Sequence, residues 1–122
     1  MALNQEIVQM TSNMTKNDGI ARINSAIEQV KSFIKQIEAI PGSRNDKPCD
    51  SYIQKATQFI LTYSNDVKQY KNMTEQEFRS LDLYYIFKFF VSNFNSLELT
   101  CKTLVARGPQ HKMSEPCKKG PY

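Results

Sequence analysis

The strongest constraint on the fold of this chain is a 59-residue stretch, from Cys49 to Arg107, that contains neither Gly nor Pro. A β-sandwich or barrel needs a turn about every 8–12 residues, and Gly or Pro marks many of those turns. The whole chain has 122 residues, with 40% hydrophobic and 23% charged residues, which is typical of one globular domain. We therefore predict a single all-α domain spanning residues 1–122.

Apolar periodicity divides the chain into about four helices, which we expect near residues 3–16, 19–40, 47–71 and 74–107. The second and third helices each carry one apolar stripe with alternating spacings of three and four residues. Asp18 is a predicted N-cap after a helix stop at residues 17–19. Asp46 with Pro48 predicts the start of the third helix, and residues 74–77 form a capping-box motif.

The predicted fourth helix is apolar on more than one side, which favours a central position in the bundle. One of its stripes comprises Phe78, Leu81, Tyr85 and Phe89, and the other comprises Leu83, Ile86, Phe90, Phe94, Leu97, Cys101 and Leu104. A helix this long is expected to be bent or broken, and residues 93–96 are its predicted weak point. We expect a helical body over residues 3–107 and an irregular basic tail over 108–122.

The net charge of +4 is concentrated near the C-terminus, because residues 1–101 are balanced. The candidate electrostatic tail contains Lys102, Arg107, Lys112, Lys118 and Lys119, opposed by Glu115 alone. Such a tail either steers an acidic partner or is only a solvated end. The neutral helices carry no basic stripe, which argues against nucleic-acid binding.

Secretion is the predicted localisation, with a cytosolic protein as the alternative. Residues 1–15 lack the apolar core of a signal peptide, so a secreted form would be a mature chain. Two glycosylation sequons begin at Asn13 and Asn72, and three cysteines favour an oxidising compartment. We predict no membrane span, because charged and polar residues interrupt the most apolar segment, residues 81–99.

Three cysteines predict one disulfide that includes Cys49, with Cys101 or Cys117 as its partner. A hairpin that folds near Asn72 would place residue 49 opposite about residue 96. Cys101 would then lie about one and a half turns away, at ~1.5 Å per residue. The pair Cys49–Cys101 is favoured over Cys49–Cys117, and the sequence leaves the choice open.

No catalytic constellation is evident, so we predict a non-enzyme without cofactor or metal. Cys49, Cys101, Cys117 and the single histidine, His111, could in principle bind zinc, but no C-x₂₋₄-C pair is present. Glu75 and Glu77 belong to a helix N-terminus, where the macrodipole accounts for them. The exposed polar faces of 19–40 and 47–71, with the tail, are the predicted binding surfaces.

The aromatic run over residues 84–90 has two interpretations. Core packing is the first. The second is a pocket between helices for a lipid or similar ligand, which would make the protein a small secreted carrier. Its expected cavity would be lined by Tyr63, Tyr85, Phe89 and Phe90. A helical cytokine-like ligand is a further alternative.

The fourth helix and the tail carry a resemblance to a known family. Residues 77–91, Thr100-Cys101-Lys102, residues 106–109 and the ending Glu115-Pro116-Cys117-Lys118 resemble the small helical salivary proteins of anopheline mosquitoes, the albicin and anophensin type. The resemblance implies a secreted, monomeric, non-enzymatic inhibitor of host defence during blood feeding. The implied partner is the C3 convertase of the alternative complement pathway, C3bBb. The alternative target is the plasma contact system, through factor XII and kininogen.

Overall fold

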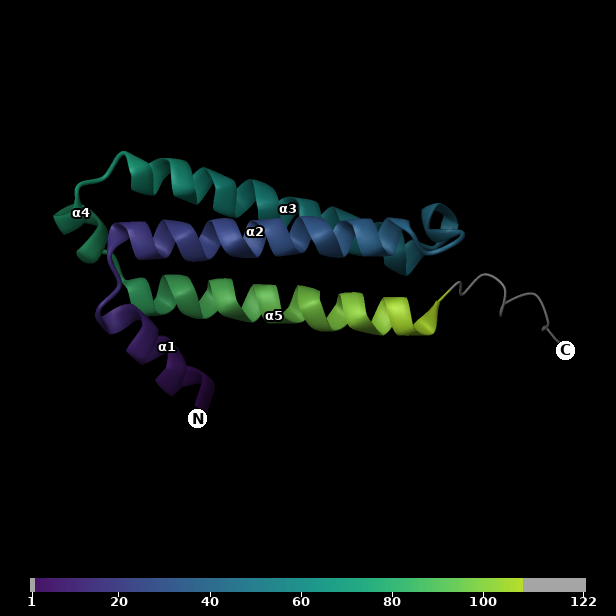
Figure 1. Ribbon diagram of the computed structural model, residues 1–122, viewed down its shortest axis with the longest axis horizontal. Helices are drawn as coiled ribbons and strands as arrows, with labels where there is room; N and C mark the ends of the chain where they lie inside the picture. Colours follow the sequence, from purple (N-terminus) through teal and green to yellow (C-terminus); the bar gives the residue numbers. More distant parts are fainter. Residues whose placement is uncertain (1, 109–122) are drawn as a thin grey trace, which may run out of the picture.

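The computed structural model describes residues 2–108, and every regular element within that range is helical (Figure 1). The tail residues His111, Lys112, Cys117, Lys118 and Lys119 lie outside it. The elements are α1 (Ala2–Ser12), α2 (Lys16–Glu38), the 3-10 turn η1 (Ser43–Asn45), α3 (Lys47–Lys71), α4 (Glu75–Arg79) and α5 (Leu83–Arg107).

Three long helices, α2, α3 and α5, lie side by side, and α3 runs antiparallel to the other two (Figure 1). The most extensive contact joins α2 to α3, and α2 also packs along α5. The short α4 connects α3 to α5 at one end of the bundle. The main packing partner of α1 is α5. α3 and α5 are also in contact, so each of the three long helices packs against the other two, and α5, predicted to be central, additionally contacts α1.

The apolar stripes predicted from periodicity form the core. In α2 the buried members include Ile23, Ile27, Val30 and Ile37, and in α3 they include Ala56, Tyr63, Val67 and Tyr70. The second stripe of the predicted fourth helix is also buried, at Leu83, Phe90, Leu97, Cys101 and Leu104. Successive members of each set are three, four or seven positions apart, so each set faces one direction on its helix.

The boundary between the first two helices differs from the expected one. α1 ends at Ser12, and the N-cap of α2 is Thr15, whose side chain accepts a hydrogen bond from the Asp18 amide at 3.0 Å. The Asp18 carboxylate accepts from the Thr15 amide in return, which completes a capping box. Gly19, predicted to lie in a helix stop, is a buried residue of the first turns of α2.

The segment predicted as the fourth helix forms two helices, because residues 80–82 between them are not helical. Ser80 ends α4, and the Asp82 side chain caps α5 by accepting from the Tyr85 amide at 3.4 Å. α5 then continues without a break through residues 93–96, where the sequence predicted a bend or a break. Aspartate before a helix is a standard N-cap, so this break has a local cause.

The extra helix α4 changes which residues of α3 and α5 face each other. Cys49 lies against Arg107, with 3.8 Å between Sγ and Nη2, where the single-hairpin register predicted residue 96. Further along, the Asn93 side chain donates to the Tyr63 hydroxyl at 3.2 Å. Because α4 and its flanking turns occupy the residues directly after α3, every α5 residue opposite α3 comes later in the sequence than expected.

Candidate interaction surface

One side of α5 exposes large apolar side chains to solvent. Tyr85 is 55% exposed, Phe89 is 62% exposed and Leu99 is 67% exposed. Phe87 and Phe90, which point to the opposite side, are buried. A step of 100° per residue places 87 and 90 toward the other helices and 85 and 89 away from them. The aromatic run therefore divides between the core and the surface.

The rest of this outer side is uncharged. Three small polar residues, Ser92, Ser96 and Thr103, are also exposed and lie on the same side of the helix as the three apolar residues. We call the six residues the outer stripe: Tyr85, Phe89, Ser92, Ser96, Leu99 and Thr103. An exposed patch of large apolar side chains is uncommon on a monomer and often marks a site of protein binding.

Lysines border the outer stripe on one side. Lys88 lies with its Nζ 5.7 Å from the centre of the Tyr84 ring, and Lys102 is exposed with its Nζ 4.0 Å from a Glu98 oxygen. Such surface pairs contribute little to stability. The lysine charges are therefore accessible to an incoming partner.

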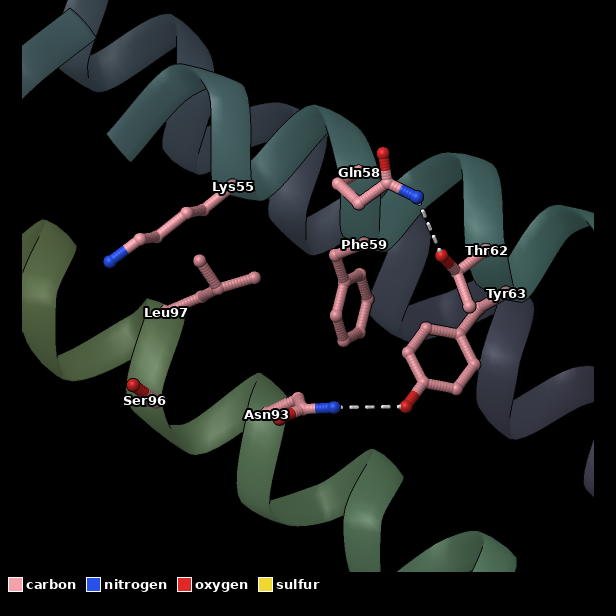
Figure 2. Close-up of a pocket in the computed structure, with 8 residues that line it drawn as sticks. All are labelled: Lys55, Gln58, Phe59, Thr62, Tyr63, Asn93, Ser96 and Leu97. Carbon is pink, nitrogen blue, oxygen red and sulfur yellow. Dashed lines mark hydrogen bonds between the residues drawn. The ribbon is translucent and has the colours of Figure 1, made fainter. Parts of the chain in front are cut away.

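On its other side the outer stripe meets a groove between α3 and α5 (Figure 2). The groove has a volume of about 290 Å³, with Phe59 and Leu97 as its apolar part. Asn93 and Ser96 line it from α5, and Lys55 extends from α3 toward α5 (Figure 2). The Gln58 side chain donates to the Thr62 hydroxyl at 3.1 Å along the same rim.

The exposed face of α2 is charged, in contrast to the outer stripe. Lys31 donates to Glu28 at 3.1 Å, and Lys35 and Glu38 are also exposed. An exposed ion pair at three-residue spacing is typical of a solvated helix surface. The sequence placed the binding surface on the polar faces of α2 and α3, and the structure offers α5 as the better candidate.

A polar cluster joins the start of α3 to the end of α5. Asp46, the N-cap of α3, accepts from the Cys49 amide at 3.1 Å and forms an ion pair with Arg107, 61 residues later. Hydrogen bonding from the Cys49 thiol, then from Arg107, holds the pKa of Asp46 below its ordinary value of 3.8. Arg107, which the sequence placed in the electrostatic tail, is thus the last residue of α5 and is ion-paired with Asp46.

The two described cysteines are buried free thiols, and no bond joins Cys49 to Cys101. The Cys101 sulfur faces α2, 3.8 Å from the Phe33 carbonyl oxygen, while the Cys49 sulfur faces Arg107. Burial raises the pKa of Cys49 to about 11 and also raises that of Cys101. The favoured pairing of these two cysteines is therefore not found, because the α3–α5 register separates them. The alternative partner, Cys117, lies outside residues 2–108.

Both predicted sequon asparagines, Asn13 and Asn72, are exposed. The threonines of these sequons have a second role, because Thr15 and Thr74 are the N-caps of α2 and α4. Each forms a capping box, so the Thr residues are needed at these positions whether or not a glycan is attached.

The four residues expected to enclose a ligand cavity are divided between the core and the surface. Tyr63 and Phe90 pack edge to face in the core with their ring centres 5.0 Å apart, and Tyr85 and Phe89 point to solvent. Among the described residues no three His, Cys, Asp or Glu side chains could hold one metal ion. Over residues 2–108, no helix is both long and apolar enough to cross a bilayer.

The sequence pattern does not predict the outer stripe, because it groups Tyr85 and Phe89 with Phe78 and Leu81 in one apolar stripe. The break at 80–82 separates those two pairs, so they no longer share one helix face. Ser80 and Asp82, both common beside helix ends, were the available signal. No family model, no curated protein and no solved structure matches this chain.

Proposed function

We propose that this protein acts by binding a larger protein through the outer stripe of α5. The observation that supports the proposal is the exposure of Tyr85, Phe89 and Leu99 on one uncharged helix face. Tyrosine is enriched among residues that dominate binding energy, and aromatic residues including phenylalanine are enriched in interfaces. The groove beside Ser96 adds a concave region in which a partner side chain can be buried.

We further propose that the protein is a secreted, non-enzymatic inhibitor of host defence, as its resemblance to anopheline salivary proteins implies. The proposed partner is the alternative-pathway C3 convertase, C3bBb. Blocking by surface occupancy needs no reacting group, and a standard interface of about 800 Å² per partner is a sizeable share of a domain this small. Exposed Asn13 and Asn72 are compatible with glycosylation in a secretory pathway.

The test is a pair of plasma assays with the same protein preparation. One assay measures lysis of rabbit erythrocytes in human serum with magnesium and EGTA, which reports the alternative pathway. The other measures kallikrein generation after kaolin contact. Inhibition of the first alone supports the proposal, and inhibition of the second alone moves the target to factor XII or kininogen. Absence of inhibition in both at micromolar protein overturns it.

Surface variants then assign the inhibition to α5. Phe89→Ser and Leu99→Ser should weaken inhibition about tenfold or more, since a buried interface anchor commonly contributes ~2 kcal/mol. Leu61→Ser is the matched control, because Leu61 is a 60% exposed leucine on α3 that lies outside the outer stripe. If all three variants inhibit equally well, the outer stripe is not part of the binding site.

A further inference from the structure

The outer stripe of α5 has the spacing of a coiled-coil contact line. Its six residues, Tyr85, Phe89, Ser92, Ser96, Leu99 and Thr103, follow one another at intervals of four, three, four, three and four. This alternation is the a/d pattern by which one helix packs along another. α5 already uses its opposite side, with Phe87, Leu97 and Cys101, to pack in the core. The helix therefore carries two packing faces, of which only one has a partner among residues 2–108.

From this spacing we infer that α5 pairs with a helix of its protein partner, packed lengthwise along the outer stripe. The inference rests on the proposed function, because it assumes a protein partner and specifies its chemistry. From residue 85 to residue 103 the contact line extends over about 27 Å, at ~1.5 Å per residue. A partner helix of about 20 residues spans this length.

The size of the side chains sets the shape of the partner helix. Ser92 and Ser96 occupy the middle of the line, and both are exposed. Phe89 and Leu99 stand on either side of them, each more than 60% exposed. A large apolar residue of the partner fits over the two serines, and smaller residues fit opposite Phe89 and Leu99, in the manner of knobs and holes.

Charge selects an acidic partner helix. Lys88 and Lys102 border the line on one side, and Lys55 extends over the groove on the other (Figure 2). Glu98, on the same helix, lies 4.0 Å from Lys102 and already offsets part of that charge. Residues flanking an a/d line determine partner choice through their charges, so glutamates at the flanks of the partner would be favoured. A second copy of this chain would present the same lysines again, which makes self-pairing the less favourable alternative.

The test uses two synthetic 21-residue helical peptides with the same leucine and alanine contact line. One carries glutamate at all flanking positions and the other carries lysine. Fluorescence anisotropy measures their binding to the full chain. We expect the glutamate peptide to bind with micromolar affinity and the lysine peptide about tenfold or more weakly.

Charge reversal on the protein provides the sharpest comparison. The double variant Lys88→Glu with Lys102→Glu should bind the lysine peptide better than the glutamate peptide. The control reverses two exposed lysines of α2, Lys31→Glu with Lys35→Glu, and should keep the original preference. Phe89→Ser should abolish binding of both peptides, whereas Leu61→Ser should not. All the substituted side chains are solvent-accessible, and circular dichroism confirms that each variant is folded.

Several outcomes would overturn the inference. Equal binding of the two peptides would exclude an acidic helix as the partner. A preference that charge reversal at Lys88 and Lys102 leaves unchanged would exclude it as well. If sedimentation velocity shows a dimer that Phe89→Ser abolishes, the outer stripe pairs with a second copy of this chain instead. If the plasma assays show inhibition that depends on Phe89 but neither peptide binds, the proposed function stands and helix pairing fails. If the glutamate peptide binds and neither plasma assay responds, helix pairing stands and the proposed target fails.

Discussion

The ring of Phe78 lies directly against Gly19, so closely that a Cβ atom at position 19 would come within 2.7 Å of the ring Cζ. Phe78 is fully buried, and its ring also packs edge to face on Tyr70, with 5.3 Å between ring centres. This contact holds the short helix α4 against the start of α2. Lys16 reinforces it from the same turn of α2, because its Nζ donates to the Met73 carbonyl oxygen at 2.8 Å.

Gly19→Ala should therefore destabilise the fold, although alanine favours a helix more than glycine does. The added methyl group displaces a rigid buried ring, and overpacking of this kind typically costs about 1–3 kcal/mol. Chemical denaturation measures the change in the free energy of unfolding. Asn24→Ala, at an exposed position of the same helix, is the control and should be neutral or stabilising. Adding Phe78→Leu to Gly19→Ala should recover part of the loss; a simple sum of the two effects would contradict the contact.

Truncation of Phe87 should destabilise the fold strongly, whereas truncation of Phe89 should leave its stability nearly unchanged. Phe87→Ala removes a ring with 0% exposure and should cost about 3–5 kcal/mol in thermal or chemical unfolding. Phe89→Ala removes a ring that is mostly in water and should change stability by less than about 0.5 kcal/mol. A large loss from Phe89→Ala would mean that this side of α5 is covered, which would exclude it as a free binding surface.

Asp46→Asn should destabilise the protein at pH 7 by about 1–2 kcal/mol, since it weakens the N-cap of α3 and the ion pair with Arg107. The folded pKa of Asp46 lies below 3.8, so its carboxylate stabilises the fold above about pH 4. That contribution is lost as the pH falls through the folded pKa. Urea titrations should thus show a difference between wild type and variant at pH 7 that shrinks by pH 3. Asp50→Asn, an exposed change in the same helix, should show a smaller effect at pH 7.

Alkaline pH should destabilise the protein through its buried tyrosines. Burial raises the pKa of Tyr70 to about 12 and also raises the pKa of Tyr52, whose hydroxyl donates to the Leu97 carbonyl oxygen at 2.8 Å. Unfolded tyrosines ionise near pH 10, so the tyrosine contribution to the free energy of unfolding should hold below about pH 10 and fall above it. Tyr52→Phe should cost about 0.5–1.5 kcal/mol at neutral pH and make the alkaline decline less steep. Equal slopes for wild type and variant would contradict burial of this hydroxyl.

Cys49 and Cys101 should remain unbonded to each other and react slowly. Both side chains are almost fully buried, and burial raises both thiol pKa values, so little thiolate is available at pH 8. In a Cys117→Ser variant, Ellman's reagent should label both thiols about 100-fold or more slowly in the native state than in guanidinium. Peptide mapping without reductant should recover the two cysteines in separate peptides. A peptide pair linked through them would refute the α3–α5 register.

The helical class and much of the helix layout follow from the local sequence, because these features depend on residues within one or two turns of each other. The capping box of Thr74 and Glu77 and the start of α3 at Asp46 and Pro48 are present as predicted. The apolar stripes of α2 and α3 became the buried faces for the same reason. The start of α2, which was predicted three residues too late, also has a local signal, since Thr15 and Asp18 form a capping box.

The tertiary structure alone decided which sides of α5 are covered. A helix that is apolar on several sides does not specify which of them its neighbours bury. The predicted stripes included Phe89 and omitted Phe87, whereas Phe87 is buried and Phe89 is exposed. The register between α3 and α5 depends on where the connecting chain turns, and the insertion of α4 placed Arg107 beside Asp46 and separated Cys49 from Cys101. The role of Gly19 likewise depends on a ring 59 residues away, because only packing brings Phe78 against it. Contacts between distant residues gain their free energy only once the whole chain is assembled, and the local pattern therefore does not contain them.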